Sequence, residues 1–209
     1  MKVLFVDDHA IFRRGLTQII GDNFDKVEIG EAGMASEAMR LVRDGNWDLA
    51  VLDISLPDRS GIELLKQIKT EKPKLPVLML SMYAEDQYAV RAMRAGAAGY
   101  LTKESAPDEL AAAVRKVAGG GRYITASLAE RLAMALDDNT DRPPHESLSD
   151  REYQVLSLIA SGKTASEIAE ELKLSVKTIS TYRTRILEKM GMKHNAELTH
   201  YAIKNELIS

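Results

Sequence analysis

Up to about residue 120, short runs of apolar residues alternate with segments whose apolar residues recur every three or four positions. Most of the runs are continuous, as expected for strands that are buried on both faces of a parallel sheet. The segments between them have the spacing of amphipathic helices, as Ile62, Leu65 and Ile68 illustrate. The five apolar runs lie at residues 2–6, 26–30, 49–52, 76–80 and 97–101.

Five repeats of a strand followed by a helix predict an α/β domain. Its sheet should be parallel and five-stranded, with the strand order 2-1-3-4-5 of a doubly wound, flavodoxin-like fold. In such a sheet, ligands bind beyond the carboxyl ends of the strands. The residues that follow each apolar run are therefore the first place to look for a site.

The pattern changes after residue 119. Three glycines at 119–121 end the last helix of the repeat, and residues 137–147 are polar with two prolines, which predicts a linker. Leu128, Leu132 and Leu136 recur at helical spacing and predict a short helix within it. From Leu148 onward no strand-like run appears. We expect a first domain at 1–119, a linker at 120–146 and an all-α domain at 147–209.

The C-terminal segment carries repeated signals for helix starts. Ser149 with Glu152, and Thr164 with Glu167, have the spacing of capping boxes, each before an apolar-periodic stretch. Ser175 is a suitable N-cap for a third helix, and the short segment 173–174 before it predicts the turn of a helix-turn-helix.

The third helix divides into an apolar stripe and a polar face. The stripe predicted to be buried consists of Val176, Ile179, Ile186 and Met190. The polar face, rich in hydroxyl and basic side chains, contains Lys177, Thr178, Thr181, Thr184, Arg185 and Lys189, with Ser180 at its margin. Short hydroxyl side chains permit close approach to a groove of double-stranded DNA, while lysine and arginine reach phosphates or guanine edges. We therefore predict that this face binds DNA.

The composition agrees with a globular protein. The 209 residues are 45% hydrophobic and 28% charged, with a net charge of −3 and no cysteine, which excludes disulfides and thiolate chemistry. No apolar run approaches a membrane span, and acidic residues follow the N-terminus too closely for a signal peptide. These features predict a cytoplasmic protein that does not bind a membrane.

Polar residues follow four of the five predicted strands. Asp7 and Asp8 end the first, Asp53 the third, Ser81 the fourth and Lys103 the fifth. Carboxylates so close together repel one another unless a cation shares their field, and an all-oxygen set favours Mg²⁺. Asp53, alone at the central strand, is the best nucleophile for a phosphoryl group, with Asp7 and Asp8 as metal ligands. We interpret His9 as a loop or helix-start residue.

The stretches "VDDH", "LDISLPDRSG", "LS" and "AGAAGYLTK" resemble the receiver domain of two-component response regulators, over roughly residues 1–118. The resemblance implies that a sensor histidine kinase phosphorylates Asp53. It also implies that Asp7, Asp8, Asp53 and the Ser55 carbonyl hold Mg²⁺. Ser81 and Tyr100 would be a switch pair, and Lys103 would bind the phosphoryl group.

Residues 148–203 resemble the LuxR-type helix-turn-helix domain, through "LSDRE", "LIASGKTASEIAEELKLSVKTIS" and "ILEKMGMK", so that the whole chain is similar to NarL/FixJ-class regulators. The resemblance implies a recognition helix from Lys177 to Lys189 and a dimerisation helix at about 195–206. Two residues depart from the usual pattern: Ser180 stands where a basic residue is common and Tyr182 where histidine is common. Both bear on base preference.

The leading hypothesis is a transcription factor that dimerises on phosphorylation and then binds DNA, with at most slow autophosphatase activity. One alternative is a phosphohydrolase that uses an aspartyl phosphate, but such enzymes typically place a second acid two residues after the nucleophile, where this chain has Ser55. Another is a LuxR-type regulator gated by a small molecule. That regulator needs an aromatic-lined pocket, and aromatic residues make up only 5% of this chain.

Overall fold

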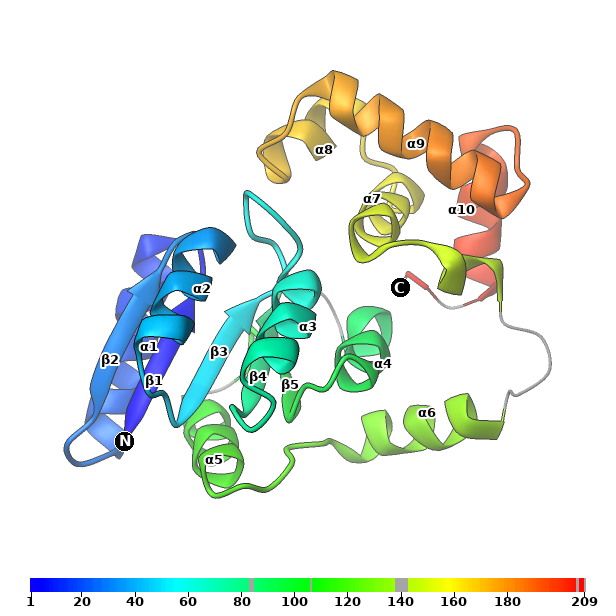
Figure 1. Cartoon of the computed structure of the whole chain (residues 1–209). Coiled ribbons are helices and arrows are strands. Elements are labelled where there is room, and N and C mark those ends of the chain that lie inside the picture. Colours follow the sequence, from blue (N-terminus) through cyan, green and yellow to red (C-terminus); the bar gives the residue numbers. More distant parts are fainter. Residues whose placement is uncertain (83–84, 106, 138–142, 206, 209) are drawn as a thin grey trace. The chain divides into compact units, whose positions relative to one another are not determined.

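The computed structural model describes residues 1–82, 85–105, 107–137, 143–205 and 207–208, without the side chains of 85–87 and 134–137. The chain forms two compact units, Met1–Ala129 and Glu130–Ser209. The first contains a sheet with flanking helices, and the second is helical (Figure 1).

The first unit contains the predicted parallel sheet. Its strand order is β2-β1-β3-β4-β5, and every neighbouring pair is parallel, which confirms the expected topology. The strands are β1 (Lys2–Val6), β2 (Glu28–Ala32), β3 (Leu49–Asp53), β4 (Val77–Ser81) and β5 (Gly99–Thr102). β3 and β4 are buried at every position, as their continuous apolar runs require.

Two strands begin two residues later than their apolar runs predicted. Lys26 has a φ of 55°, the left-handed conformation of a turn residue, so β2 begins only at Glu28. Gly96 has a φ of 99° in the turn after α4 (Glu85–Arg94), and the next two residues close that turn before β5 starts at Gly99. Apolar turn residues that pack under the sheet extended both runs beyond the hydrogen-bonded strands.

Helices cover both faces of the sheet (Figure 1). They are α1 (Ala10–Asn23), α2 (Ala35–Asp44), α3 (Gly61–Glu71), α4 and α5 (Pro107–Ala118). Alternate strand residues such as Phe5, Val51 and Leu80 form one core cluster with Leu16 of α1 and Val114 of α5. The intervening strand residues are buried as well, so the sheet has a core on each side.

The loop between β3 and α3 is tightly constrained. A Cβ on Gly61 would lie 1.9 Å from the carbonyl oxygen of Asp53, so only glycine allows this approach. Ser60 caps α3 by accepting a hydrogen bond from the N–H of Ile62. Asp58 accepts from the backbone N–H groups of Ala35 and Ser36 at the start of α2, both at 2.9 Å, and thereby ties the loop to that helix.

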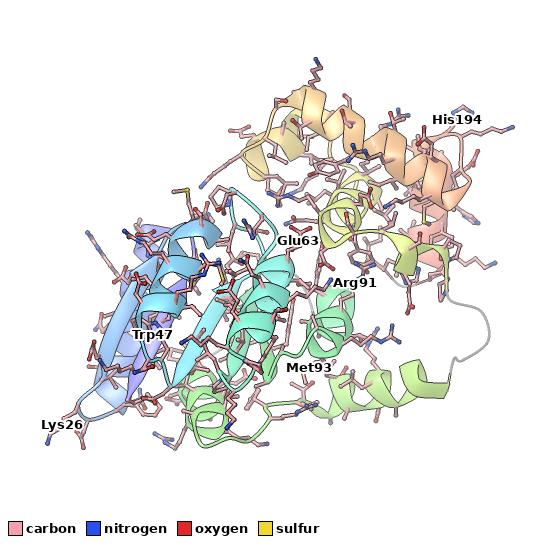
Figure 2. All side chains as sticks on the ribbon, viewed as in Figure 1. Lys26, Trp47, Glu63, Arg91, Met93 and His194 are labelled. Carbon is pink, nitrogen blue, oxygen red and sulfur yellow. The ribbon has the colours of Figure 1, made fainter. Side chains whose placement is uncertain are left out.

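Trp47 packs close to the sheet (Figure 2). A Cβ on Gly30 of β2 would lie 2.2 Å from the Trp47 indole, so the ring rests directly on the strand backbone. The indole N–H donates to the carbonyl of Leu41 in α2 at 2.8 Å. The residue therefore has a packing role.

The segment after α5 adds to the open edge of the sheet. The N–H of Tyr123 donates to the carbonyl of Ala98 at 2.8 Å, and Tyr123 forms a parallel bridge with Gly99. The helix predicted from Leu128, Leu132 and Leu136 is α6 (Ala126–Asp137). Leu128 is fully buried, while the side chain of Leu136 lies outside the described residues.

The second unit is a helical bundle. It consists of the 3₁₀ helix η1 (Pro144–Ser147), α7 (Asp150–Ala160), α8 (Ala165–Glu171), α9 (Val176–Met190) and α10 (Asn195–Lys204). Within it, α7 contacts α9 and α10, and α8 contacts α9. Both predicted capping boxes are present, at the starts of α7 and α8, and Ser175 caps α9. The turn between α8 and α9 contains Lys173, whose φ is 53°.

One residue of the predicted apolar stripe was placed wrongly. Ile179, Ile186 and Met190 are buried, but Val176 is 46% exposed. The helical period places Val176 about 60° away from Ile179 around the axis. Moreover, it is the first residue of α9, where no preceding turn covers it. The buried stripe of α9 therefore begins at Ile179.

We predict that Gly61→Ala lowers the free energy of unfolding of the first unit by about 1–3 kcal/mol, because the new methyl group forces the end of β3 to move. Urea unfolding followed by circular dichroism measures the loss. Gly15→Ala in α1 is the matched control, since a Cβ there meets nothing within 4 Å. That change should stabilise the helix by about 0.5–1 kcal/mol. Equal stability of Gly61→Ala and the wild type would show that the close approach is not a constraint.

Candidate functional site: an acidic pocket and a basic helix face

The carboxyl ends of β1, β3, β4 and β5 bring the predicted polar residues to one edge of the sheet. Asp7 and Asp53 are each only 3% exposed, and Ser81 is fully buried. Lys103 is held near Ser81 by backbone pairing, since its N–H donates to the Ser81 carbonyl at 2.7 Å. Parallel strand order therefore gathers residues that are up to 96 positions apart in sequence (Asp7 to Lys103).

Lys103 lies between the two buried acids. Its Nζ is 2.5 Å from Oδ2 of Asp7 and 2.8 Å from Oδ2 of Asp53, and it also lies 4.8 Å from the centre of the Phe12 ring. Burial lowers the pKa of this ammonium group, but the charges and hydrogen bonds of Asp53 and Asp7 outweigh burial and leave the pKa above its ordinary value. Lys103 is therefore a permanent cation that partly neutralises the pocket.

The charged form of Asp53 is destabilised by its surroundings. Burial raises its pKa to about 6; the charge of Lys103 acts against this rise, and the neighbouring charge of Asp7 adds to it. The backbone N–H of Ser55 donates to the Asp53 carboxylate and favours its charged form. The pocket thus holds one acid whose charge is incompletely compensated by the protein, and a second cation or an additional donor would relieve it.

The pocket fits a divalent metal ion. Asp7, Asp8, His9 and Asp53 each offer one ligand atom, and these atoms all lie within 4.8 Å of one another. Three carboxylates in partial burial form the hard-oxygen donor set that Mg²⁺ prefers. The residues present therefore suit the ion that the sequence predicted.

His9 has a place in this pocket that sequence reasoning missed. It precedes α1 as its N-cap, as interpreted, but its ring Nδ1 also lies 2.8 Å from Oδ1 of Asp8 and 3.2 Å from Oδ1 of Asp7. Its backbone N–H donates to Asp7 at 2.7 Å. The available signal was its position directly after the two acids, because the short loop from β1 to α1 keeps residue 9 close to the end of the strand.

The predicted switch pair lies beside the pocket. Ser81 ends β4, and Tyr100 on β5 is 1% exposed, with its ring inside the unit. Tyr88 of α4 is equally buried, and the sequence analysis did not single it out. The elements α4 and β5 are in contact, and each contributes one fully buried tyrosine to the unit.

The predicted DNA-binding face lies on α9. Lys177, Ser180, Thr181, Thr184 and Arg185 are exposed. Thr178 is half-buried, and its hydroxyl lies 2.8 Å from that of the cap residue Ser175. No acidic residue occurs between 172 and 187, so this stretch of the surface is basic.

Two basic residues of α9 have intramolecular partners. Nζ of Lys189 donates to Oε2 of Glu152 at 2.6 Å, and the same Glu152 completes the capping box of α7. Arg183 donates to the Asn195 side chain at 2.6 Å and so connects α9 to the start of α10. The structure therefore keeps Lys177 and Arg185 at the exposed face, while Lys189 also stabilises the packing of α9 on α7.

Taken together, these features define a class of protein. The first unit is a doubly wound sheet with a lysine between the acids of a buried pocket, and the second is a helix-turn-helix unit. The comparisons agree. Residues 3–115 match the response regulator receiver domain, and residues 146–202 match the bacterial regulatory proteins of the luxR family. The chain belongs to the two-component response regulators of the NarL/FixJ class.

Similar proteins cover nearly the whole chain. The response regulator UvrY of Escherichia coli is 36% identical, over 99% of this chain and 95% of that one. The response regulator GacA of Pseudomonas aeruginosa is 34% identical, over 100% and 98%. Among solved structures, RcsB from Salmonella enterica serovar Typhimurium, bound to the promoter rprA in the presence of phosphomimetic BeF3⁻, has a TM-score of 0.62. It is 26% identical, and the match covers 96% of this chain and 98% of that one.

Among the described residues, none of the helices has the length and apolar composition that crossing a membrane requires.

We predict that Mg²⁺ binds less tightly as the pH falls through about 6. The ion requires charged carboxylates, and Asp53, with its pKa raised to about 6, must lose a proton to bind. Between pH 7 and pH 5 the affinity should drop by about tenfold. Calorimetric titrations at pH 5, 6, 7 and 8 measure it.

The control for this titration is Asp53→Asn, in which no proton leaves position 53. Its weaker Mg²⁺ affinity should change much less between pH 5 and pH 7. An affinity of the wild type that is constant over this range would contradict the prediction.

Proposed function

We propose that a sensor histidine kinase phosphorylates this response regulator on Asp53, and that phosphorylation promotes dimerisation and sequence-specific DNA binding to control transcription. The main supporting observation is the buried Asp53 carboxylate, which contacts the Lys103 ammonium at 2.8 Å at the carboxyl end of the central strand. Burial and a raised pKa are typical of carboxylates at functional sites, because a buried charge that is only partly compensated costs stability.

Each pocket residue has a proposed role. Asp53 is the nucleophile, and Asp7, Asp8, the Asp53 carboxylate and the Ser55 carbonyl are the groups that would hold Mg²⁺. When bound, this ion neutralises charge on the transferred phosphoryl group. Lys103 exchanges part of its contact with Asp53 for a phosphoryl oxygen, since its Nζ is already within hydrogen-bond distance of both acids.

The product changes the pocket electrostatically. A phosphoryl group on Asp53 adds negative charge and acceptor oxygens at the end of β3. The hydroxyl of Ser81 moves to donate to one of these oxygens. The Tyr100 ring then repacks beside it, and the surface formed by α4, β5 and α5 changes shape.

The chain acts as a phosphoacceptor with at most slow autophosphatase activity. Position 55, two residues after Asp53, carries a serine and therefore supplies no carboxylate to activate water. A phosphohydrolase is the alternative, and turnover of small phosphomonoesters would reveal it.

The DNA-binding unit supplies the output. We assign the receiver to 1–119, the linker with α6 to 120–146 and the helix-turn-helix domain to 147–209. α9 enters the major groove with Lys177, Thr178, Ser180, Thr181, Thr184, Arg185 and Lys189 as contacts.

α10 is the dimerisation helix, so that a dimer presents two copies of α9 to one operator. One solved structure of RcsB is described as two RcsB dimers bound to two parallel DNAs, which supports a DNA-bound dimer. With a kinase as phosphodonor and DNA as target, we propose that the protein acts in the cytoplasm.

We predict that Asp53→Asn abolishes labelling of the protein by acetyl phosphate, because an amide cannot attack phosphorus. Treatment with acetyl phosphate should convert the wild type from monomer to dimer and raise its DNA affinity by at least tenfold. It should leave the variant unchanged. Phosphate-affinity electrophoresis, light scattering and electrophoretic mobility shifts measure the three effects.

Asp58→Asn is the matched control, since Asp58 lies in the same loop but binds the start of α2. It should still be labelled and should still dimerise. Undiminished labelling of Asp53→Asn would remove Asp53 from its role, and equal DNA affinity with and without phosphorylation would refute the coupling.

A further inference from the structure

The start of α9 carries an apolar side chain where a solvated helix end would favour a polar one. Val176 is the first residue of the helix and is 46% exposed, between the cap residue Ser175 and the exposed Lys177. Among the described residues of the helical unit, only Ile203 of α10 is another large apolar side chain with such exposure. Val176 therefore leaves apolar surface exposed at the margin of the basic face, next to Lys177 in the chain.

The exposed hydroxyl groups of α9 are already engaged by the backbone of the helix. Ser180 donates to the carbonyl of Val176 at 3.0 Å, Thr181 to that of Lys177 at 3.0 Å, and Thr184 to that of Ser180 at 3.1 Å. In this state the hydroxyl protons are not available to a ligand. What Thr181 and Thr184 offer besides oxygen lone pairs is a γ-methyl group each.

The sequence of α9 also lacks the side chains that pair with adenine. None of its fifteen residues is asparagine or glutamine, the two residues that form paired hydrogen bonds with the adenine edge. Lys177 and Arg185 can recognise guanine. Without a paired contact to adenine, the exposed methyl groups favour reading an A·T pair from its thymine, whose C5-methyl group projects into the major groove and accepts apolar contacts.

We propose that Val176 is a specificity-determining residue that reads a thymine by its C5-methyl group. This inference rests on the proposed DNA-binding function and deepens it by naming the base that the N-terminal turn of α9 recognises. Three features support DNA as the occupant. The N-terminal part of the face is basic, with no acid between 172 and 187. It belongs to the matched luxR-family segment, and N-terminal residues of a recognition helix contact base edges.

The test begins with the full-length protein treated with acetyl phosphate. Randomised DNA duplexes are selected for binding, and each thymine of the enriched half-site is then replaced in turn by deoxyuridine, which differs only in lacking the C5-methyl group. For the wild type, we expect one such replacement near the position of Val176 to weaken binding by about fourfold, the effect of one buried methyl group.

Two variants assign that thymine to Val176. Val176→Thr keeps one γ-methyl group and adds a hydroxyl, whereas Val176→Ser adds the same hydroxyl without a γ-methyl group. Both replace an exposed first-turn residue, so the fold is preserved. The deoxyuridine penalty at that position should be largely retained in Val176→Thr and lost in Val176→Ser. Met34→Ala, which alters an exposed apolar residue at the start of α2 in the receiver unit, should leave the penalty unchanged.

The possible outcomes distinguish a failure of this inference from a failure of the proposed DNA-binding function. An enriched operator with no methyl-sensitive thymine overturns the inference alone, as does a penalty that is equal in the wild type and Val176→Ser. Failure to enrich any sequence overturns DNA recognition itself, and the inference with it.

Discussion

The receiver unit depends on the charge balance around Lys103. Asp7 and Asp53 are almost fully buried, and two carboxylates in that position would repel each other without a cation between them. The ammonium group lies 2.5 and 2.8 Å from them, yet Asp53 still has a pKa raised to about 6. The metal-free pocket is therefore only partly compensated. This is the condition under which a divalent cation binds favourably, because it supplies the positive charge that the protein leaves incomplete.

Close packing around this pocket fixes the position of Asp53. Gly61 allows the chain to fold back against the end of β3, Ser60 caps the following helix, and Asp58 ties the same loop to α2. Ser81 and Lys103 are positioned by backbone pairing between β4 and β5. A change at Asp53 therefore meets closely packed neighbours, which is consistent with the proposed rearrangement through Ser81 and Tyr100.

In the helical unit, α9 combines packing and recognition. Ile179, Ile186 and Met190 bury one side, and the ion pair between Lys189 and Glu152 fastens the helix to α7. The exposed side is left with small hydroxyl residues, two long cations and the methyl groups of Val176. Since its hydroxyl protons are bound to the helix itself, the surface is more apolar than its sequence suggests.

Sequence alone determined the strand order, the capping boxes and the residues of the acid pocket. Continuous apolar runs identify buried parallel strands, and a parallel sheet places Asp7, Asp53, Ser81 and Lys103 at a common edge whatever the details of packing. Tertiary structure decided the rest: the ring contacts of His9 with the acids, the burial of Tyr88, the partner of Lys189 and the exposure of Val176. Each of these depends on contacts between side chains from elements that are distant in sequence. Local periodicity predicts which face of an element is buried, but not which element packs against that face.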